Sequence, residues 1–197
     1  MQPAEKRRIP LPIMSMFDEL PAFHATYERV ILTESLIFTP GWLVAASSCV
    51  VYAFIVAAAQ LVFSTPTRSL DGVMYAHNLL LALYSAAVTV FMAYTITNED
   101  LWSLTEMACR PIKNTFAHWV MFSFTVSKIW EWADTVFLVA RGRPLRWVHL
   151  IHHATTLWLF MLTYGYATST IGVLLNSGVH AVMYWHYAVP LPKACRP

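Results

Sequence analysis

Five apolar stretches, separated by short polar connections, dominate the hydrophobic pattern of this chain. They lie at residues 41–63, 72–96, 114–140, 145–163 and 171–189. A helix needs about 20 apolar residues to cross a bilayer, and each stretch is close to or above that length. Because a backbone in lipid must satisfy its own hydrogen bonds, the pattern predicts an all-α, multi-pass integral membrane bundle. We expect a pre-membrane tail over residues 1–40 and a single membrane domain over residues 41–197.

Composition agrees with a membrane protein and excludes some other classes. Hydrophobic residues make up 57% of the chain and charged residues 12%, whereas soluble domains carry about 25% charged residues. The formal net charge is only +2, and no basic patch is interleaved with aromatic residues, so we expect no nucleic-acid partner. Cys49, Cys109 and Cys195 are scattered, which predicts neither a disulfide framework nor a metal site.

The basic residues next to the apolar stretches are unevenly distributed between the two sides of the predicted bundle. One side holds Arg68, Arg141, Arg143, Arg146, Lys193 and Arg196. The other has only Arg110 and Lys113 close to a span. Positively charged connections stay in the cytosol, so we place the first side there and the N-terminus across the membrane.

Two groups of ionisable residues interrupt the apolar sequence in its second half. Lys128, Glu131 and Asp134 follow an i, i+3, i+6 spacing, which forms one stripe on a helix. The next apolar stretch begins with three imidazoles at i, i+3, i+4, those of His149, His152 and His153. A charged side chain at membrane depth costs roughly 2.5–3.5 kcal/mol even on insertion scales, so these groups indicate a functional site.

Three motifs in this region give the chain a resemblance to a known family. They are Lys128-x-x-Glu131-x-x-Asp134-Thr135, His149-x-x-His152-His153 and Asn176-x-x-x-His180-x-x-Met183-Tyr184. Together they resemble the ELO family of very-long-chain fatty acid elongases, which are 3-oxoacyl-CoA synthases. Asn78 and Ser85 also fit an earlier pattern of that family, whereas His186 stands where a tyrosine is usual.

The resemblance implies a seven-span architecture in the endoplasmic reticulum membrane, with the histidine box and the arginine loop toward the cytosol. Five spans are present here, and the T-x-x-Q-x-x-Q motif that follows the fifth span in the family is missing. We therefore expect a truncated chain or a fragment. The resemblance also implies membrane lipid, other elongation-cycle enzymes and a second copy of the chain as partners.

The activity implied by the resemblance is the condensation of a long-chain acyl-CoA with malonyl-CoA, giving a 3-oxoacyl-CoA, CO2 and CoA. No cofactor or metal is expected beyond these two substrates. A neutral imidazole is a competent nucleophile toward a thioester, and we assign that role to His152 with His180 as its partner. His149, Asn176 and Tyr184 are expected to donate hydrogen bonds to the oxyanion, with His153 completing the catalytic box.

Supporting roles fall to the remaining motif residues and to the arginine loop. Glu131 and Asp134 are expected to orient ring N–H groups, and Lys128 to pair with them, beside Thr135. Arg141, Arg143 and Arg146 are placed to bind CoA phosphates. The ion pairs could instead be architectural, and the positive-inside bias alone would place the arginines there. We interpret His186 as structural, because it lies roughly 120° around its helix from the face of His180. We also interpret His77, which stands beside Asn78, as structural, because no other residue of the pattern supports it.

Three other functions stay open. A di-iron desaturase or hydroxylase needs about eight clustered histidines, whereas only His149, His152, His153 and His180 can converge here. An inactive, truncated elongase-like protein would explain the missing glutamine motif. A transporter would fit the intramembrane charges, although the chain has no internal repeat of the kind that such folds contain.

Overall fold

The computed structural model describes residues 40–99, 103, 114–163 and 167–189, and within them the regular elements are α-helices. The five helices are α4 (Pro40–Val62), α5 (Asp71–Asn98), α7 (Thr115–Ala140), α8 (Trp147–Leu162) and α9 (Ala167–Ala188). The all-α fold with five helices is therefore confirmed. The predicted tail, apart from Pro40, lies outside the described residues, as do Cys109, Arg110, Lys113, Lys193, Cys195 and Arg196.

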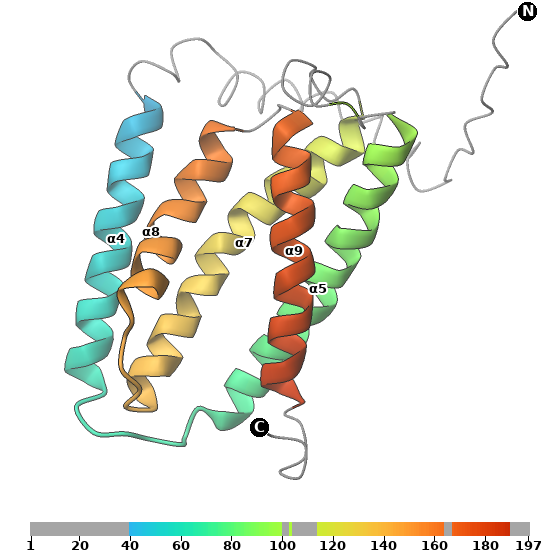
Figure 1. Cartoon of the computed structure of the whole chain (residues 1–197). Coiled ribbons are helices and arrows are strands. Elements are labelled where there is room, and N and C mark those ends of the chain that lie inside the picture. The colour runs from blue at the N-terminus through green and yellow to red at the C-terminus, as the bar shows by residue number, and fades with distance from the viewer. Residues whose placement is uncertain (1–39, 100–102, 104–113, 164–166, 190–197) are drawn as a thin grey trace, which may run out of the picture.

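The helices run alternately up and down through one bundle (Figure 1). α5 packs closely along α9, and α4 packs along α8. α7 lies between these pairs and contacts all four of the other helices. The helix that carries the Lys128 stripe is thus the central one, so side chains on several of its faces meet neighbouring helices.

The ends of α7 follow from local sequence chemistry. The Asn114 side chain caps its first turn by accepting hydrogen bonds from the backbone N–H groups of Phe116 and Ala117, at 2.9 and 3.3 Å. At the other end, Gly142 adopts a φ of 63°, a left-handed conformation that glycine tolerates best. The backbone N–H of Thr67 donates to the carbonyl of Ala140 at 2.8 Å, which fastens the α4–α5 connection to this turn.

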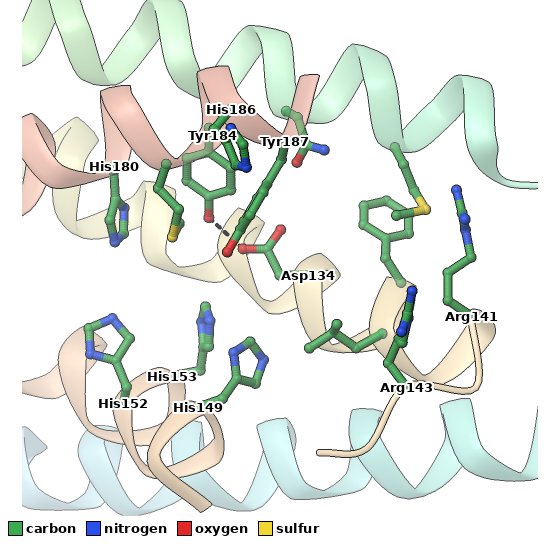
Figure 2. A pocket seen from close by; sticks show the side chains of 15 residues that line it. Asp134, Arg141, Arg143, His149, His152, His153, His180, Tyr184, His186 and Tyr187 are labelled. Carbon is green, nitrogen blue, oxygen red and sulfur yellow. Dashed lines mark hydrogen bonds between the residues drawn. The ribbon is translucent and has the colours of Figure 1, made fainter. Parts of the chain in front are cut away.

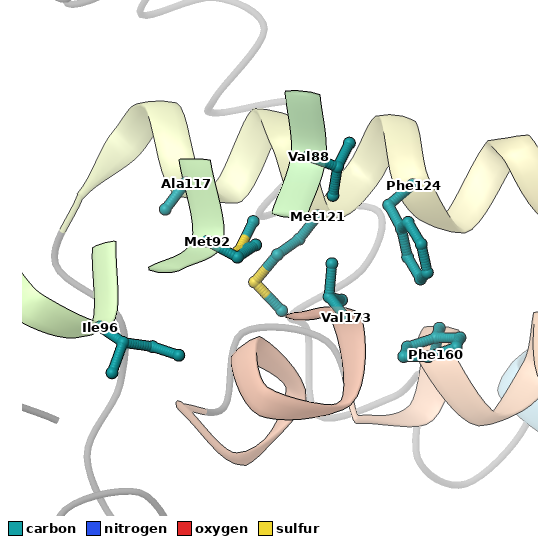
Figure 3. Close-up of a cluster of buried hydrophobic side chains, with 8 residues drawn as sticks. All are labelled: Val88, Met92, Ile96, Ala117, Met121, Phe124, Phe160 and Val173. Atoms are coloured by element: carbon teal, nitrogen blue, oxygen red, sulfur yellow. The ribbon is translucent and has the colours of Figure 1, made fainter. Parts of the chain in front are cut away.

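The largest buried apolar cluster fills the half of the bundle away from the α7–α8 turn (Figure 3). It comprises Val88, Met92, Ile96, Ala117, Met121, Phe124, Phe160 and Val173, contributed by α5, α7, α8 and α9. The rings of Phe124 and Phe160 pack edge to face with their centroids 4.9 Å apart. This cluster holds four helices together and leaves their other halves for polar side chains.

The outer surface of the bundle is strongly apolar. Leu61, Val90 and Val148 are 83%, 72% and 80% exposed, and Trp147 is 78% exposed. Among the described helices, α5 is both long and apolar enough to cross a membrane by length and composition, and α4 contains a shorter apolar stretch, Ala46–Val62. α7 and α9 carry most of their polar residues on inward faces, which leaves mainly apolar side chains outside.

Candidate active site

A cavity of about 940 Å³ lies among the halves of the helices that end near the α7–α8 turn (Figure 2). Its polar lining comes from Asn78, Asp134, Arg141, Arg143, His149, His152, His153, His180, Tyr184, His186 and Tyr187. Figure 2 shows the histidines of α8 facing His180 and Tyr184 of α9, with the two arginines at the far end. The three sequence motifs therefore contribute to one cavity.

The first turns of α8 place the three imidazoles of the histidine box at different depths. His153 is 5% exposed, and its backbone carbonyl accepts a hydrogen bond from Trp132 Nε1 at 3.0 Å. The His149 and His153 ring centroids are 4.3 Å apart. His152 turns toward α9, where its ring centroid lies 6.3 Å from that of His180. His152 is thus the histidine of the box that faces a histidine on another helix.

Lys128 is the buried cation of the site. Its Nζ donates to Glu131 Oε1 at 2.7 Å and to Asn176 Oδ1 at 2.7 Å, and it lies 4.0 Å from the centroid of the Phe124 ring. Because an ammonium group can only donate, it fixes the amide oxygen of Asn176 toward itself and leaves the NH2 group for other acceptors. Glu131 Oε1 is also 3.2 Å from His180 Nδ1, without hydrogen-bond alignment.

Asp134 joins three helices at the cavity wall. Its Oδ2 accepts a hydrogen bond from the Tyr184 hydroxyl of α9 at 2.5 Å, and its Oδ1 lies 2.9 Å from Nε2 of His77 on α5. The contact gives His77 a partner that the sequence pattern did not indicate, and it joins α5 to α7. Tyr184 is fully buried and already donates to Asp134, so its proton is not directed to a substrate oxyanion in this arrangement.

Thr135 links the histidine box to α4. Its Oγ1 lies 2.8 Å from His149 Nε2 and 2.8 Å from the hydroxyl of Tyr52. Both Thr135 and Tyr52 are buried. The threonine of the first motif therefore orients the first histidine of the second motif.

A second cavity, of about 860 Å³, opens between α8 and α9. It shares His149, His152, His180 and Met183 with the first cavity. Its remaining lining is mainly apolar, with Leu159, Phe160, Leu175 and Val179. The His152–His180 pair thus stands where a cavity with arginines meets a largely apolar one.

Several buried polar atoms at the site have no hydrogen-bond partner among the described residues. They are Glu131 Oε2, His153 Nδ1 and His180 Nδ1. Folded proteins rarely leave such atoms unsatisfied, and a concentration of them is typical of functional sites. No group of three His, Cys, Asp or Glu side chains that could hold a metal ion occurs in the described part of the chain.

The sequence profile of the ELO (GNS1/SUR4) family matches residues 38–195. The chain belongs to this family. It is 31% identical over 121 residues to fatty acid elongase A of Dictyostelium discoideum, a match that covers 60% of this chain and 45% of the relative. It is also 36% identical over 118 residues to long chain fatty acid elongase 1 of Caenorhabditis elegans, covering 56% of this chain and 40% of the relative.

A mouse relative, very long chain fatty acid elongase 3, is 29% identical over 165 residues, which are 79% of this chain and 60% of that protein. The chain thus spans about half the length of the curated relatives it matches. Membership of the ELO family identifies the bundle as a membrane domain and supports a role in fatty acid elongation.

The three ELO motifs contribute residues to both cavities, and the structure adds residues that the motifs omit. His152 and His180 face each other, Asn176 is held by Lys128, and Thr135 contacts His149. Tyr52 and His77 come from helices without a complete motif. The only sequence signal for His77 was its place beside Asn78, and Tyr52 had none.

The arginines and His186 have separate positions around the two cavities. Arg141 lines the first cavity, and its Nη2 pairs with Asp71 Oδ1 at 2.7 Å. Arg143 lines the same cavity, whereas Arg146 lines the second. His186 is exposed and lines the first cavity (Figure 2), so its assignment to a purely structural face does not describe its position.

Proposed function

We propose that this chain carries the condensing site of fatty acid elongation. The reaction joins a long-chain acyl-CoA to malonyl-CoA and yields a 3-oxoacyl-CoA two carbons longer, CO2 and CoA. The observation that carries the proposal is the His152–His180 pair, with ring centroids 6.3 Å apart, at the meeting point of an arginine-lined and an apolar cavity. A long-chain acyl-CoA has a polar CoA part and an apolar acyl chain joined by a thioester, and these two parts match the two cavities.

The proposed reaction begins with attack by a neutral imidazole nitrogen of His152 on the thioester carbonyl carbon. The carbon–sulfur bond breaks, CoA leaves as the thiolate and takes up a proton, and the acyl group is held on the ring. Malonyl-CoA then loses CO2, and the electron pair of the broken bond forms an enolate. The enolate attacks the acyl carbon, the imidazole leaves, and the longer 3-oxoacyl-CoA is released.

Negative charge develops on the carbonyl oxygen at both attacks, so hydrogen-bond donors beside the histidine pair are needed. Lys128 donates to the side-chain oxygen of Asn176, so the NH2 group of Asn176 is the part of that amide that can donate to the oxyanion. His149 lines both cavities and is the second candidate. Each well-placed donor contributes about 10²–10³-fold to the rate in well-studied sites. His180 is the proposed partner at the same carbonyl.

The two cavities are proposed to hold different parts of the substrate. Arg141 and Arg143 would bind CoA phosphates at the end of the first cavity. Arg146, at the start of α8, would bind them from the edge of the second cavity. Binding through Arg141 requires exchange of its ion pair with Asp71. The acyl chain would lie against Leu159, Leu175 and Val179 in the second cavity.

The proposed location is the endoplasmic reticulum membrane, with the α7–α8 turn toward the cytosol. Arg68, Arg141, Arg143 and Arg146 all lie at that end of the bundle, as the positive-inside bias requires (Figure 1). Cytosolic acyl-CoA and malonyl-CoA would then enter from the arginine side. Association with other elongation enzymes, or with a second copy, remains part of the proposal.

Expression of the chain in cells that lack their own elongase tests the proposed function. Membranes are supplied with a long-chain acyl-CoA and labelled malonyl-CoA, and labelled 3-oxoacyl product is measured. Wild type is expected to form product, and His152→Ala to lower the rate by roughly 10³-fold or more. His118→Ala, which changes a histidine of α7 that lines neither cavity, is the control.

Inserted wild-type protein that forms no labelled product would overturn the condensing activity. The inactive, elongase-like alternative of the sequence analysis would then be favoured.

A further inference from the structure

Tyr52 is a buried residue of α4, a helix that contains none of the motifs, yet it connects to the histidine box. It is 3% exposed, and its hydroxyl lies 2.8 Å from Thr135 Oγ1. Thr135 Oγ1 in turn lies 2.8 Å from His149 Nε2. The three side chains therefore form a chain of two hydrogen bonds. It starts at Tyr52, which precedes Thr135 by 83 positions in the sequence, and ends at His149 in the cavity lining.

The directions of these two hydrogen bonds follow from counting donors. A hydroxyl has one proton to donate, and a neutral imidazole has one N–H and one bare nitrogen. If Tyr52 donates to Thr135, and Thr135 donates to His149 Nε2, every proton in the chain has an acceptor. If His149 donates from Nε2 instead, either the Tyr52 or the Thr135 hydroxyl loses its only acceptor among the described residues.

A buried donor without an acceptor is disfavoured, so the first direction is favoured. In that direction Nε2 of His149 is the acceptor, and the proton of the neutral ring lies on Nδ1. With Nε2 occupied by Thr135, Nδ1 is the ring nitrogen left for the cavities that His149 lines. The ring thus offers them a hydrogen-bond donor.

We propose that Thr135 is a positioning residue that fixes the Nδ1–H tautomer of His149, so that His149 donates to the oxyanion, and that Tyr52 holds the Thr135 hydroxyl in place by donating to it. The assignment of a catalytic consequence rests on the proposed condensing function. The tautomer itself does not depend on the reaction, which allows the two to be tested separately.

Packing around Tyr52 keeps its hydroxyl in place. Its ring centroid lies 5.4 Å from that of Trp132 and 6.2 Å from that of His153. Trp132 is itself tied to the histidine box through its hydrogen bond to the carbonyl of His153. Tyr52→Phe would keep these ring contacts and remove only the hydroxyl, which shows whether Thr135 donates to His149 without that support.

The first experiment measures the protonated ring nitrogen of His149 by ¹⁵N NMR on the purified, histidine-labelled chain in detergent. The signal is assigned by its loss in His149→Gln. The expected result is a proton on Nδ1 and a bare, hydrogen-bonded Nε2. A proton on Nε2 in the wild-type protein would overturn the proposal without any variant of Tyr52.

The second experiment compares Tyr52→Phe, Thr135→Val and Thr135→Ser with the wild type. Thr135→Val removes the donor to Nε2 and is expected to populate the Nε2–H form. Thr135→Ser and Tyr52→Phe keep a hydroxyl at position 135 whose acceptor is Nε2, so they are expected to keep the wild-type tautomer. Tyr84→Phe is the matched control for Tyr52→Phe, because its hydroxyl contacts Ser123 on an exposed surface outside the cavities. An unchanged tautomer in Thr135→Val would contradict the proposal.

Kinetics give the corresponding catalytic readout. Thr135→Val is expected to lower kcat about fivefold, the shift that the loss of one net hydrogen bond produces, with little change in KM for acyl-CoA. A rise in KM at constant kcat would overturn the catalytic role. If wild type forms no product, the condensing function fails, but the NMR result still decides the tautomer.

Discussion

Nε2 of His77 lies 2.9 Å from Oδ1 of Asp134, although 57 positions separate the two residues in the chain. The side chains are 7% and 17% exposed, so the contact forms in a largely dry part of the bundle. Because a carboxylate accepts only, the proton of this hydrogen bond lies on His77 Nε2. Together with the Tyr184 hydroxyl on Oδ2, the contact ties α5, α7 and α9 together at the cavity wall.

Replacement of His77 is expected to destabilise the bundle. His77→Leu leaves Asp134 Oδ1 without this donor, at a cost of about 1–3 kcal/mol. His77→Gln keeps an amide N–H and should lose less. Thermal unfolding in detergent, followed by circular dichroism, measures both. His186→Leu, at an exposed position, serves as the control and should change stability by no more than about 0.5 kcal/mol. Equal unfolding temperatures for His77→Leu and His186→Leu would show that the contact contributes nothing.

Removal of the Lys128 charge is expected to cost more than removal of the whole ion pair. Lys128→Met leaves the carboxylate of Glu131 buried beside Asn176 without its cation, which destabilises a protein by about 3–5 kcal/mol. The double variant Lys128→Met with Glu131→Leu removes both charges and should recover part of that loss. A double-mutant cycle in denaturant measures the coupling. Strictly additive losses would mean that the two side chains are energetically independent.

The sequence was sufficient to predict the helices and the residues that repeat with helical spacing on them. The i, i+3, i+4 spacing of His149, His152 and His153 groups them on one helix, and the three motifs lead to one cavity. Spacing along a helix does not specify which neighbour packs against it. The contacts of Tyr52 with Thr135 and of His77 with Asp134 depend on α4 and α5 packing beside α7, so they required the structure.

Gly142 is expected to be intolerant of a side chain, unlike Gly72. At Gly142 the backbone has a φ of 63°, and an added Cβ would lie 2.7 Å from Pro66 Cγ. Gly142→Ala should therefore destabilise the bundle by about 1–2 kcal/mol or more. Gly72 lies in the first turn of α5, and an added Cβ there meets nothing within 4 Å, so Gly72→Ala should be neutral or stabilising by up to about 1 kcal/mol. Paired thermal unfolding curves test this, and a comparable loss in both variants would refute it.

Arg143 is expected to act on the nucleotide part of the substrate and not on the reaction at the histidines. It lines the arginine end of the first cavity, away from the His152–His180 pair (Figure 2). Arg143→Gln removes one charge-assisted contact to phosphate and should raise KM for acyl-CoA about tenfold with little change in kcat. Arg68→Gln is the control, because Arg68 is exposed at the same end of the bundle but does not line either cavity.

An acyl pantetheine thioester has no nucleotide phosphates, so wild type and Arg143→Gln should use it equally. A tenfold difference with that truncated substrate would mean that Arg143 acts through the fold or the reacting groups, because the phosphates it was expected to bind would be missing.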